Sequence, residues 1–419
     1  MAETGNVQAK IPIADGNNDD QAKDEQPSPQ KKIRALVLSG FGGLKSVKIM
    51  ERLEPTVGKE EVLIRVKASG MNFIDLMVRQ GVINNLPKTP FVMGFECAGK
   101  VEAVGEEVTE LQVGDSVAAL TEYKAWAELT NVPAKFVYKL PTGMSFQDAT
   151  ALLMSFVIAQ ILLFDIGNIR KGQSVLVHSV GGGVGQAVAQ LCKTVPDVIV
   201  IGTASRHKHE SIKDSVTHVI DHDSDYVQEV KKYELSQDGV DLVLDCLCGD
   251  DTNKGYSLLK PLGRYVLYGT SNVVSGETKS FFTFAKSWWQ VDKISPMRLF
   301  DENKSLTGFH LRHLLYQQGQ DKYVRQVVNT VFELWSNGKI KPVIDSTWAF
   351  EDVSEAMQKL HDRKNIGKII LDPSMEPKSK QQANAGKDKE TTDEKAVAGN
   401  RETEKVNKEY ESSSSSSAK

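Results

Sequence analysis

The part of this sequence with the clearest chemical use is a glycine-rich turn after the aliphatic run 175–177. Glycines occupy positions 181, 182, 183 and 185, and an Ala- and Gln-containing helical pattern continues from Gln186. A strand, a tight turn and a helix N-terminus in this order present backbone N–H groups and a positive dipole end to a pyrophosphate. A glycine turn without a ligand is the alternative. The residues expected at the pyrophosphate are Gly182, Gly183, Val184 and Gly185.

Segment 200–208 favours NADP(H) over NAD(H). The second strand of a dinucleotide-binding fold usually ends in an acidic residue that binds the ribose hydroxyls, and this segment contains none. Instead, Thr203 and Ser205 offer hydroxyls, while Arg206 and Lys208 offer positive charge. This set suits a 2′-phosphate. The alternative is that residues 206–208 are only the solvated start of a helix.

These residues require a parallel sheet to position them, and the sequence from residue 174 onward predicts one. Alternating strands and helices indicate an α/β, doubly wound sheet. The expected strands are 175–178, 198–202, 219–221, 240–246 and 265–269, and the expected helices are 184–194, 207–214, 226–233 and 252–259. The preceding part predicts short strands at 34–39, 62–68, 99–104 and 115–120, and the ordered part ends with a helix at 353–363 and a strand at 368–371.

Length and composition exclude several classes of protein. A chain of 419 residues with 40% hydrophobic and 25% charged residues is typical of a globular protein with room for two domains. A net charge of −4 argues against nucleic-acid binding. The spacing of Cys97, Cys192, Cys246 and Cys248 indicates reduced thiols rather than disulfides or a metal site.

The ends and the longest apolar run indicate a cytoplasmic protein. No signal peptide is visible, and the run 151–164 is too short to span a bilayer, so we expect a buried helix there. Any membrane association would be peripheral. Residues 1–32 and 373–419 are polar and are expected to be disordered tails.

Several motifs resemble one enzyme family. They are 66–75 (VKASGMNFID), 94–101 (GFECAGKV), 114–117 (GDSV), 259–264 (LKPLGR) and the glycine turn. Together they are similar to the medium-chain dehydrogenase/reductase superfamily, and specifically to its zinc-independent quinone oxidoreductase branch. The resemblance implies a GroES-like β-rich catalytic domain at 33–156 and 315–372, a Rossmann NADP-binding domain at 157–314, and substrate between them. It also assigns His222, Gly269 and Asn365 to the cofactor site.

The resemblance further implies catalysis without zinc. Zinc members of the superfamily have Cys and His where this sequence has Asn72 and Phe95, and neither of these is a plausible zinc ligand here. A reductase without a Lewis acid needs hydrogen-bond donors. Asn72 is therefore the candidate catalytic donor to the acceptor oxygen, with a turn-stabilising role after Gly70 as the alternative. Asp75 is expected to be structural or to orient Asn72.

Some residues depart from the pattern of the branch. Two tyrosines of the quinone reductases are replaced by Met77 and Ile83, the Thr-Ala-Tyr segment reads 158–160 (IAQ), and the cofactor-stacking tyrosine reads His222. Segments 72–81, 286–289 and 365–368 resemble a vesicle-associated subgroup of the branch. We therefore expect NADPH-dependent hydride transfer to a quinone or enone. The alternative is a nucleotide-binding, membrane-peripheral adaptor or lipid- or vesicle-associated protein, on a vesicle or the mitochondrial outer membrane.

A homodimer is also expected. The strand at 265–269 is predicted to lie near the edge of the Rossmann sheet, and an exposed edge must be covered or paired. Pairing would use this strand and the segment near 273–284. The aromatic segment 281–289 could wall the substrate cleft or touch lipid, or it could pack in the core or at the dimer contact.

Overall fold

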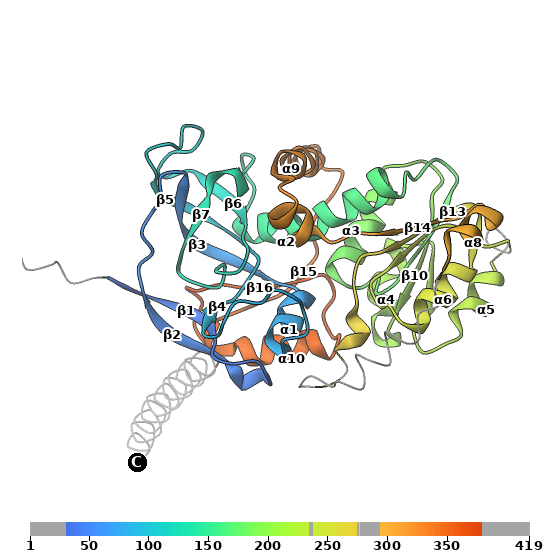
Figure 1. Ribbon diagram of the computed structural model, residues 1–419, viewed down its shortest axis with the longest axis horizontal. Coiled ribbons are helices and arrows are strands. Elements are labelled where there is room, and N and C mark those ends of the chain that lie inside the picture. Colours follow the sequence, from blue (N-terminus) through green and yellow to red (C-terminus); the bar gives the residue numbers. More distant parts are fainter. Residues whose placement is uncertain (1–30, 234–237, 275, 277–293, 379–419) are drawn as a thin grey trace, which may run out of the picture. The chain divides into compact units, whose positions relative to one another are not determined.

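The computed structural model describes residues 31–233, 238–274, 276 and 294–378 (Figure 1). The described residues from Lys32 to Lys378 belong to one unit. Strand β1 already begins at Lys32 and the description continues to Lys378, so the fold extends slightly into both expected tails. The rest of those tails and the aromatic segment 281–289 lie outside the described residues.

Two sheets form the first part of the fold. A three-stranded sheet has the order β2-β1-β4, and a second sheet has the order β15-β16-β3-β5-β6-β8, with β7 paired to β3. The strands of the small sheet are β1 (Lys32–Leu38), β2 (Val47–Leu53) and β4 (Phe91–Val92). Those of the larger sheet are β3 (Glu61–Met71), β5 (Glu96–Val104), β6 (Ser116–Leu120), β7 (Leu129–Pro133), β8 (Val137–Lys139), β15 (Ile344–Trp348) and β16 (Lys368–Leu371).

A six-stranded parallel sheet forms the second part, with the order β11-β10-β9-β12-β13-β14. Its strands are β9 (Ser174–Val177), β10 (Ile199–Ala204), β11 (His218–Asp221), β12 (Val240–Asp245), β13 (Leu259–Leu267) and β14 (Ser305–Gly308). This is the strand order of a Rossmann fold, so the predicted fold class is confirmed. Strand β13 lies next to the edge of this sheet, as expected, but the edge itself is β14, a strand that the sequence analysis missed.

Helices connect and cover these sheets. They are α1 (Phe73–Gln80), α2 (Phe146–Gln160), α3 (Gly183–Cys192), α4 (His209–Ile212), α5 (Tyr226–Lys231), α6 (Asp250–Ser257), α8 (Pro296–Glu302), α9 (Asp321–Ser336) and α10 (Val353–His361). The single helix expected at 207–214 is instead the short α4 between two 3₁₀ turns at 206–208 and 213–215.

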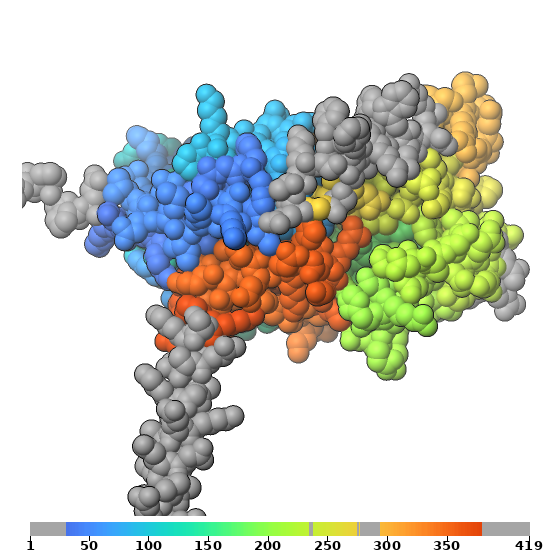
Figure 2. Space-filling model, turned by 90° about the horizontal axis from the view of Figure 1, so that it is seen from below, coloured from blue at the N-terminus to red at the C-terminus, as the bar shows by residue number. Residues whose placement is uncertain are grey.

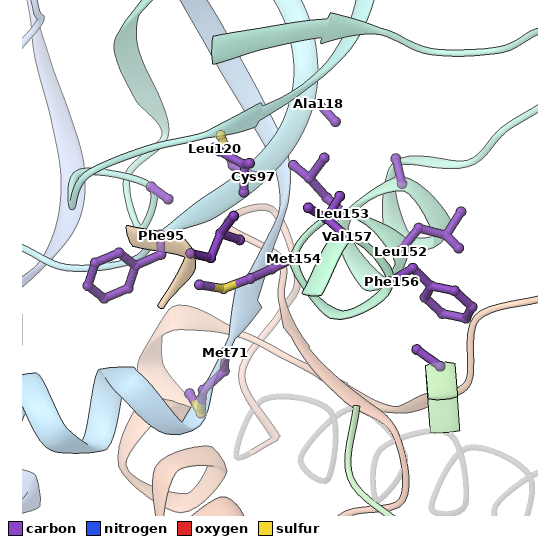
Figure 3. Close-up of a cluster of buried hydrophobic side chains, with 14 of the residues drawn as sticks. Met71, Phe95, Cys97, Ala118, Leu120, Leu152, Leu153, Met154, Phe156 and Val157 are labelled. Atoms are coloured by element: carbon purple, nitrogen blue, oxygen red, sulfur yellow. The ribbon is translucent and has the colours of Figure 1, made fainter. Parts of the chain in front are cut away.

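Helix α2 is the central core helix. Ser145 caps it by accepting from the Asp148 N–H, and a π-helical turn at Ile161–Ile166 extends it. The combined helix, Phe146–Ile166, extends beyond the expected run 151–164 and is long and apolar enough to cross a membrane by length and composition alone. Its most apolar window is nonetheless 72% buried inside the protein. Figure 3 shows its side chains, including Leu153 and Val157, packed with residues from strands of the larger sheet.

The C-terminal segment returns to the first part of the chain. Strand β16 pairs antiparallel with β3, and Arg34 of β1 forms a 2.8 Å ion pair with Glu351. In Figure 2 this segment, coloured orange to red, lies against the blue N-terminal strands. The register aligns Met71 with Ile369, so the start of β16 lies beside the end of β3.

Candidate active site

A cavity of about 790 Å³ joins the two parts of the fold. Its walls come from α1 and α2 on one side and from the carboxyl ends of the Rossmann strands on the other, where such sheets bind their ligands. Except for Arg206, the residues that the sequence analysis assigned to catalysis or to the cofactor line this cavity. They are Asn72, Gly182, Gly183, Val184, Gly185, Thr203, Ser205, Lys208, His222, Gly269 and Asn365.

The glycine turn leaves the start of α3 open to a ligand. A Cβ on Gly183 would lie 2.7 Å from Ser155 Oγ, and one on Gly185 would lie 2.5 Å from the Cα of Val180, so packing requires both glycines. A Cβ on Gly182, the N-cap of α3, would come no closer than 3.3 Å to any other group. The first-turn N–H groups of a helix have no partners within it. This geometry fits a pyrophosphate.

Of the two cations predicted near the cofactor, Arg206 and Lys208, the fold brings Lys208 to the cavity. Its side chain is buried, and Nζ donates to the backbone oxygen of Asn365 at 2.7 Å. Burial, helped by the nearby charge of Arg363, lowers the pKa of Lys208 to about 8. Arg206 is exposed and does not line the cavity. Of the two cations expected at a 2′-phosphate, only Lys208 therefore lines the cavity.

Thr203 and His222, at the same end of the cavity as Lys208, have partners that the sequence did not reveal. The hydroxyl of Thr203 lies 3.0 Å from Nδ1 of His178, whose pKa is lowered by burial. His222 lies 3.4 Å from a carboxylate oxygen of Asp221 and 3.5 Å from one of Asp223. These two acids lie outside segment 200–208, so the search for carboxylates there missed negative charge beside the expected cofactor site.

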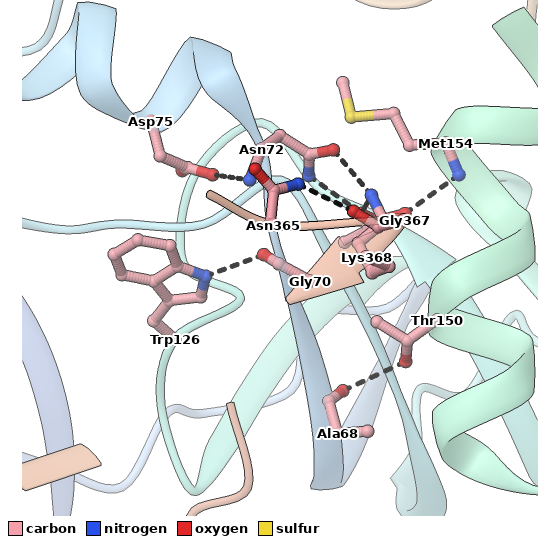
Figure 4. Close-up of polar contacts among 11 residues, drawn as sticks. Ala68, Gly70, Asn72, Asp75, Trp126, Thr150, Met154, Asn365, Gly367 and Lys368 are labelled. Atoms are coloured by element: carbon pink, nitrogen blue, oxygen red, sulfur yellow. Dashed lines mark hydrogen bonds and ion pairs between the residues drawn. The ribbon is translucent and has the colours of Figure 1, made fainter. Parts of the chain in front are cut away.

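Asn72 lies at the other end of the cavity, where β3 ends and α1 begins. Its backbone N–H donates to Asp75 Oδ2 at 2.8 Å, so Asn72 does occupy the N-cap position of α1. Its side-chain Nδ2 donates to Glu96 Oε1 at 2.8 Å, and its Oδ1 accepts from Lys368 Nζ at 2.6 Å (Figure 4). Burial raises the pKa of Asp75 well above its usual range. The amide group is thus held on two sides.

Glu96 and Lys368 are site residues to which the sequence analysis gave no role. They form a 2.8 Å ion pair, and their side chains are 0% and 2% exposed. Glu96 Oε2 also accepts the backbone N–H of Met154 in α2 at 2.8 Å. A Cβ on Gly70 would lie 2.1 Å from the Glu96 carboxylate, so glycine is required there. The only sequence signal for these two residues was that each is a charged residue inside a segment that carries the family resemblance, 94–101 for Glu96 and 365–368 for Lys368.

The wall beside Asn72 is apolar. Met77 and Ile83, which replace tyrosines of the resembling branch, both line the cavity. Met154, Ile158 and Phe309 line it as well, whereas Gln160 does not. These positions offer no hydroxyl donor. This wall therefore places the Asn72 amide beside hydrophobic surface.

The positions of the zinc ligands in related enzymes hold other groups here. Phe95 is buried, with its ring centroid 5.1 Å from that of Tyr123, and Asn72 is hydrogen-bonded as described. Within the described part of the chain, one group of potential ligands has its atoms within 4.8 Å of one another, Asp221, His222 and Asp223. Exposed acidic groups of this kind are common without an ion. Neither Asn72 nor Phe95 provides the chemistry of a zinc ligand.

Comparisons with known proteins agree with this architecture. Residues 58–142 match the alcohol dehydrogenase GroES-like domain, and residues 215–371 match the family described as zinc-binding dehydrogenase. The human synaptic vesicle membrane protein VAT-1 homolog-like is 57% identical over 366 residues, which cover 86% of this chain and 87% of that protein. A crystal structure of the human VAT-1 homolog-like protein has a TM-score of 0.73 and 52% identity, covering 83% of this chain and 99% of that one.

More distant solved structures share the fold. A quinone oxidoreductase from Pseudomonas syringae is 27% identical with a TM-score of 0.70, covering 81% of this chain and 100% of that chain. A mycobacterial protein complexed with NADPH has the same identity, TM-score and coverage. With the GroES-like and Rossmann parts both present, the chain belongs to the VAT-1 homolog family of the medium-chain dehydrogenase/reductase superfamily, in its quinone oxidoreductase-like branch.

Proposed function

We propose that this protein is a zinc-independent, NADP(H)-dependent oxidoreductase that reduces a quinone or an enone. The observation that carries the proposal is the single cavity that contains both the open N-terminus of α3 and the side chain of Asn72. When bound, the nicotinamide supplies the hydride. The chain itself would hold the pyrophosphate at Gly182–Gly185 and donate a hydrogen bond from Asn72 to the acceptor oxygen, where negative charge develops.

The preference for NADP(H) is supported by Lys208. Its buried ammonium lines the cavity beyond the glycine turn, and a charge-assisted hydrogen bond to a 2′-phosphate would distinguish NADPH from NADH. The NADPH bound to a 27% identical relative supports the same assignment. Fluorescence titration of the full-length protein with both cofactors tests it: tighter binding of NADPH is expected, and equal affinities would reject the assignment.

The apolar wall indicates the character of the acceptor. Because Met77, Ile83 and Ile158 offer no hydrogen bonds, an acceptor would be bound by its hydrophobic surface and oriented by Asn72. Turnover of NADPH with a panel of small and bulky quinones and enones tests the enzyme assignment. Faster reduction of the bulkier, more apolar acceptors is expected.

A second candidate is a nucleotide-binding adaptor without robust catalysis. The replacement of hydroxyl-bearing side chains by Met77 and Ile83 in the cavity favours it. NADPH binding without reduction of any acceptor in the panel would support the adaptor and reject the enzyme. Fold by itself does not decide between the two, because the superfamily fold hosts many functions.

We also propose that the protein associates peripherally with vesicle membranes from the cytoplasmic side. The names of the relatives, synaptic vesicle membrane proteins, support this location. The one described helix that could cross a membrane by length and composition, Phe146–Ile166, is largely buried in the fold, so it would have to unpack to insert. Flotation with vesicles that is lost in high salt or carbonate is the expected result.

We further propose a homodimer paired through the Rossmann sheet. Strand β14 is the edge of that sheet, and Leu306 on it is 39% exposed. Nearby in the chain, Met297 and Phe300 of α8 are 65% and 75% exposed. An exposed edge strand beside apolar side chains is a surface that proteins normally pair or cover.

A further inference from the structure

The ammonium group of Lys368 holds a central place in the buried polar cluster. Its Nζ donates to Asn72 Oδ1 at 2.6 Å and to Glu96 Oε1 at 2.8 Å, and its side chain is 2% exposed (Figure 4). An ion pair this deeply buried is costly to desolvate and is weak evidence of a gain in stability. Its presence at the wall of the cavity therefore calls for another explanation.

The charges of Lys368 and Glu96 determine the orientation of the Asn72 side-chain amide. The carbonyl oxygen faces the ammonium of Lys368, and the NH₂ group faces the carboxylate of Glu96. A flipped amide would place NH₂ against the ammonium and oxygen against the carboxylate, which is unfavourable at both contacts. An NH₂ group has two N–H donors, and the structure gives Nδ2 of Asn72 one acceptor among the described residues. The second donor therefore remains available at the cavity that Asn72 lines.

Strand β16 also connects this amide to the glycine turn. The N–H of Gly367 donates to the backbone oxygen of Gly181 at 2.9 Å, and Gly367 directly precedes Lys368. A Cβ on Gly183 would lie 4.0 Å from Cε of Lys368, so the lysine side chain passes beside the start of α3. One short segment thus contacts both the turn that would hold the cofactor and the amide that would meet the acceptor.

We propose that Lys368, held by Glu96, is a positioning residue that orients the Asn72 amide so that one N–H points to the acceptor oxygen. This inference rests on the proposed oxidoreductase function. Lys368 acts through Asn72 on the acceptor. A donor fixed in advance needs no reorganisation as charge develops, which is the basis of its effect on rate.

The test removes both charges together, because Lys368→Met alone would leave the buried Glu96 carboxylate unpaired. The double variant Lys368→Met/Glu96→Gln keeps an acceptor for Asn72 at position 96. We expect kcat to fall by at least 10-fold, with the affinity for NADPH and the melting temperature nearly unchanged. Lys368→Arg should recover part of the activity. Adding the double variant to Asn72→Ala should cause no further loss beyond that of Asn72→Ala alone, because Lys368 and Glu96 act only through the Asn72 amide.

A control is the ion pair between Lys139 of β8 and Asp115, just before β6, which does not line the cavity. Lys139→Met/Asp115→Asn should leave kcat and NADPH affinity unchanged. Two results would overturn the proposal. The first is that the fold losses in kcat of Asn72→Ala and of the double variant multiply when the changes are combined. The second is a large loss of NADPH affinity with unchanged kcat, which would make Lys368 a cofactor ligand.

A measurement without turnover separates this inference from the proposed function. In protein labelled with ¹⁵N-asparagine, the two side-chain N–H signals of Asn72 are identified by their loss in Asn72→Ala. Well-separated signals are expected in the natural protein, and their collapse toward free-amide positions is expected in Lys368→Met/Glu96→Gln. Unchanged signals in that variant would reject the positioning role. Absence of turnover in the natural protein would reject only the proposed function.

Discussion

The side-chain oxygen of Asn72 lies 2.6 Å from Nζ of Lys368, although 296 positions separate the two residues in the chain. This contact exists because β16, near the C-terminal end of the described chain, pairs with β3. It places a buried charge directly behind the amide expected to meet the acceptor. The polar chemistry of this end of the cavity is therefore shared among α1, β5 and β16 rather than carried by one motif.

Asn72→Ala should lower turnover by about 100- to 1000-fold, the usual cost of removing one donor to a developing oxyanion. NADPH affinity should stay nearly unchanged, because Asn72 and the glycine turn come from different parts of the fold. Steady-state kinetics and fluorescence titration measure the two effects. Thermal melting is the control: a lower melting temperature with unchanged activity per folded molecule would show that Asn72 only stabilises the turn and the start of α1.

Lys208→Glu should weaken NADPH binding by roughly 5- to 150-fold, which corresponds to about 1–3 kcal/mol for a charge-assisted hydrogen bond. NADH binding should change far less, because NADH has no 2′-phosphate. Titration of each cofactor by fluorescence measures this. Arg206→Glu is the matched control, since Arg206 is exposed and outside the cavity. An equal loss for the two cofactors would argue against a contact to the phosphate.

NADPH affinity should fall as the pH rises above about 8, the pKa to which burial lowers Lys208. Only the protonated amine attracts the phosphate, so below this pKa the ammonium is already present and affinity is flat with respect to this group. Above this pKa, the amine of Lys208 must take up a proton before it can attract the phosphate, and this lowers the affinity for NADPH. NADH affinity should lack this dependence, and Lys208→Met should remove it from NADPH. A flat NADPH profile from pH 7 to 9.5 in the natural protein would contradict the prediction.

The purified protein should contain no stoichiometric zinc, because Asn72 and Phe95 stand at the positions of zinc ligands in the zinc enzymes of the superfamily. Elemental analysis after dialysis against a weak chelator measures the zinc content. One zinc per chain that survives this treatment would overturn the prediction. Activity should likewise be insensitive to strong chelators.

Leu306→Glu should split the proposed homodimer, because it places a charge on the exposed edge strand β14. Multi-angle light scattering at micromolar concentration measures the assembly, and melting temperature checks the fold. Val274→Pro, in the segment near 273–284 that the sequence predicted at the dimer contact, is a poorer test. Val274 is buried and its N–H donates to Ser271 at 3.1 Å, so proline would disturb the fold itself. A monomeric natural protein would reject the dimer.

The sequence alone determined the glycine turn of the site and the elements on either side of it. The strand, the glycine turn and helix α3 are contiguous, so their relation follows from local geometry and from the hydrophobic period of each element. Strands that alternate with helices also define the Rossmann sheet, because parallel neighbours need such connections. The same local reasoning missed β14, since its four residues carry little pattern of their own.

The tertiary structure decided which residues surround Asn72 at the other end of the cavity. Nothing near Asn72 in the sequence reveals Glu96, 24 residues away, or Lys368, 296 residues away, as its partners. The sequence likewise did not show that Lys208 reaches the cavity while Arg206 remains exposed, or that Asp221 and Asp223 flank His222. Such relations depend on which strands pair and which side chains are buried together. They arise from long-range packing, because a buried charge must find its partner wherever the folded chain places one.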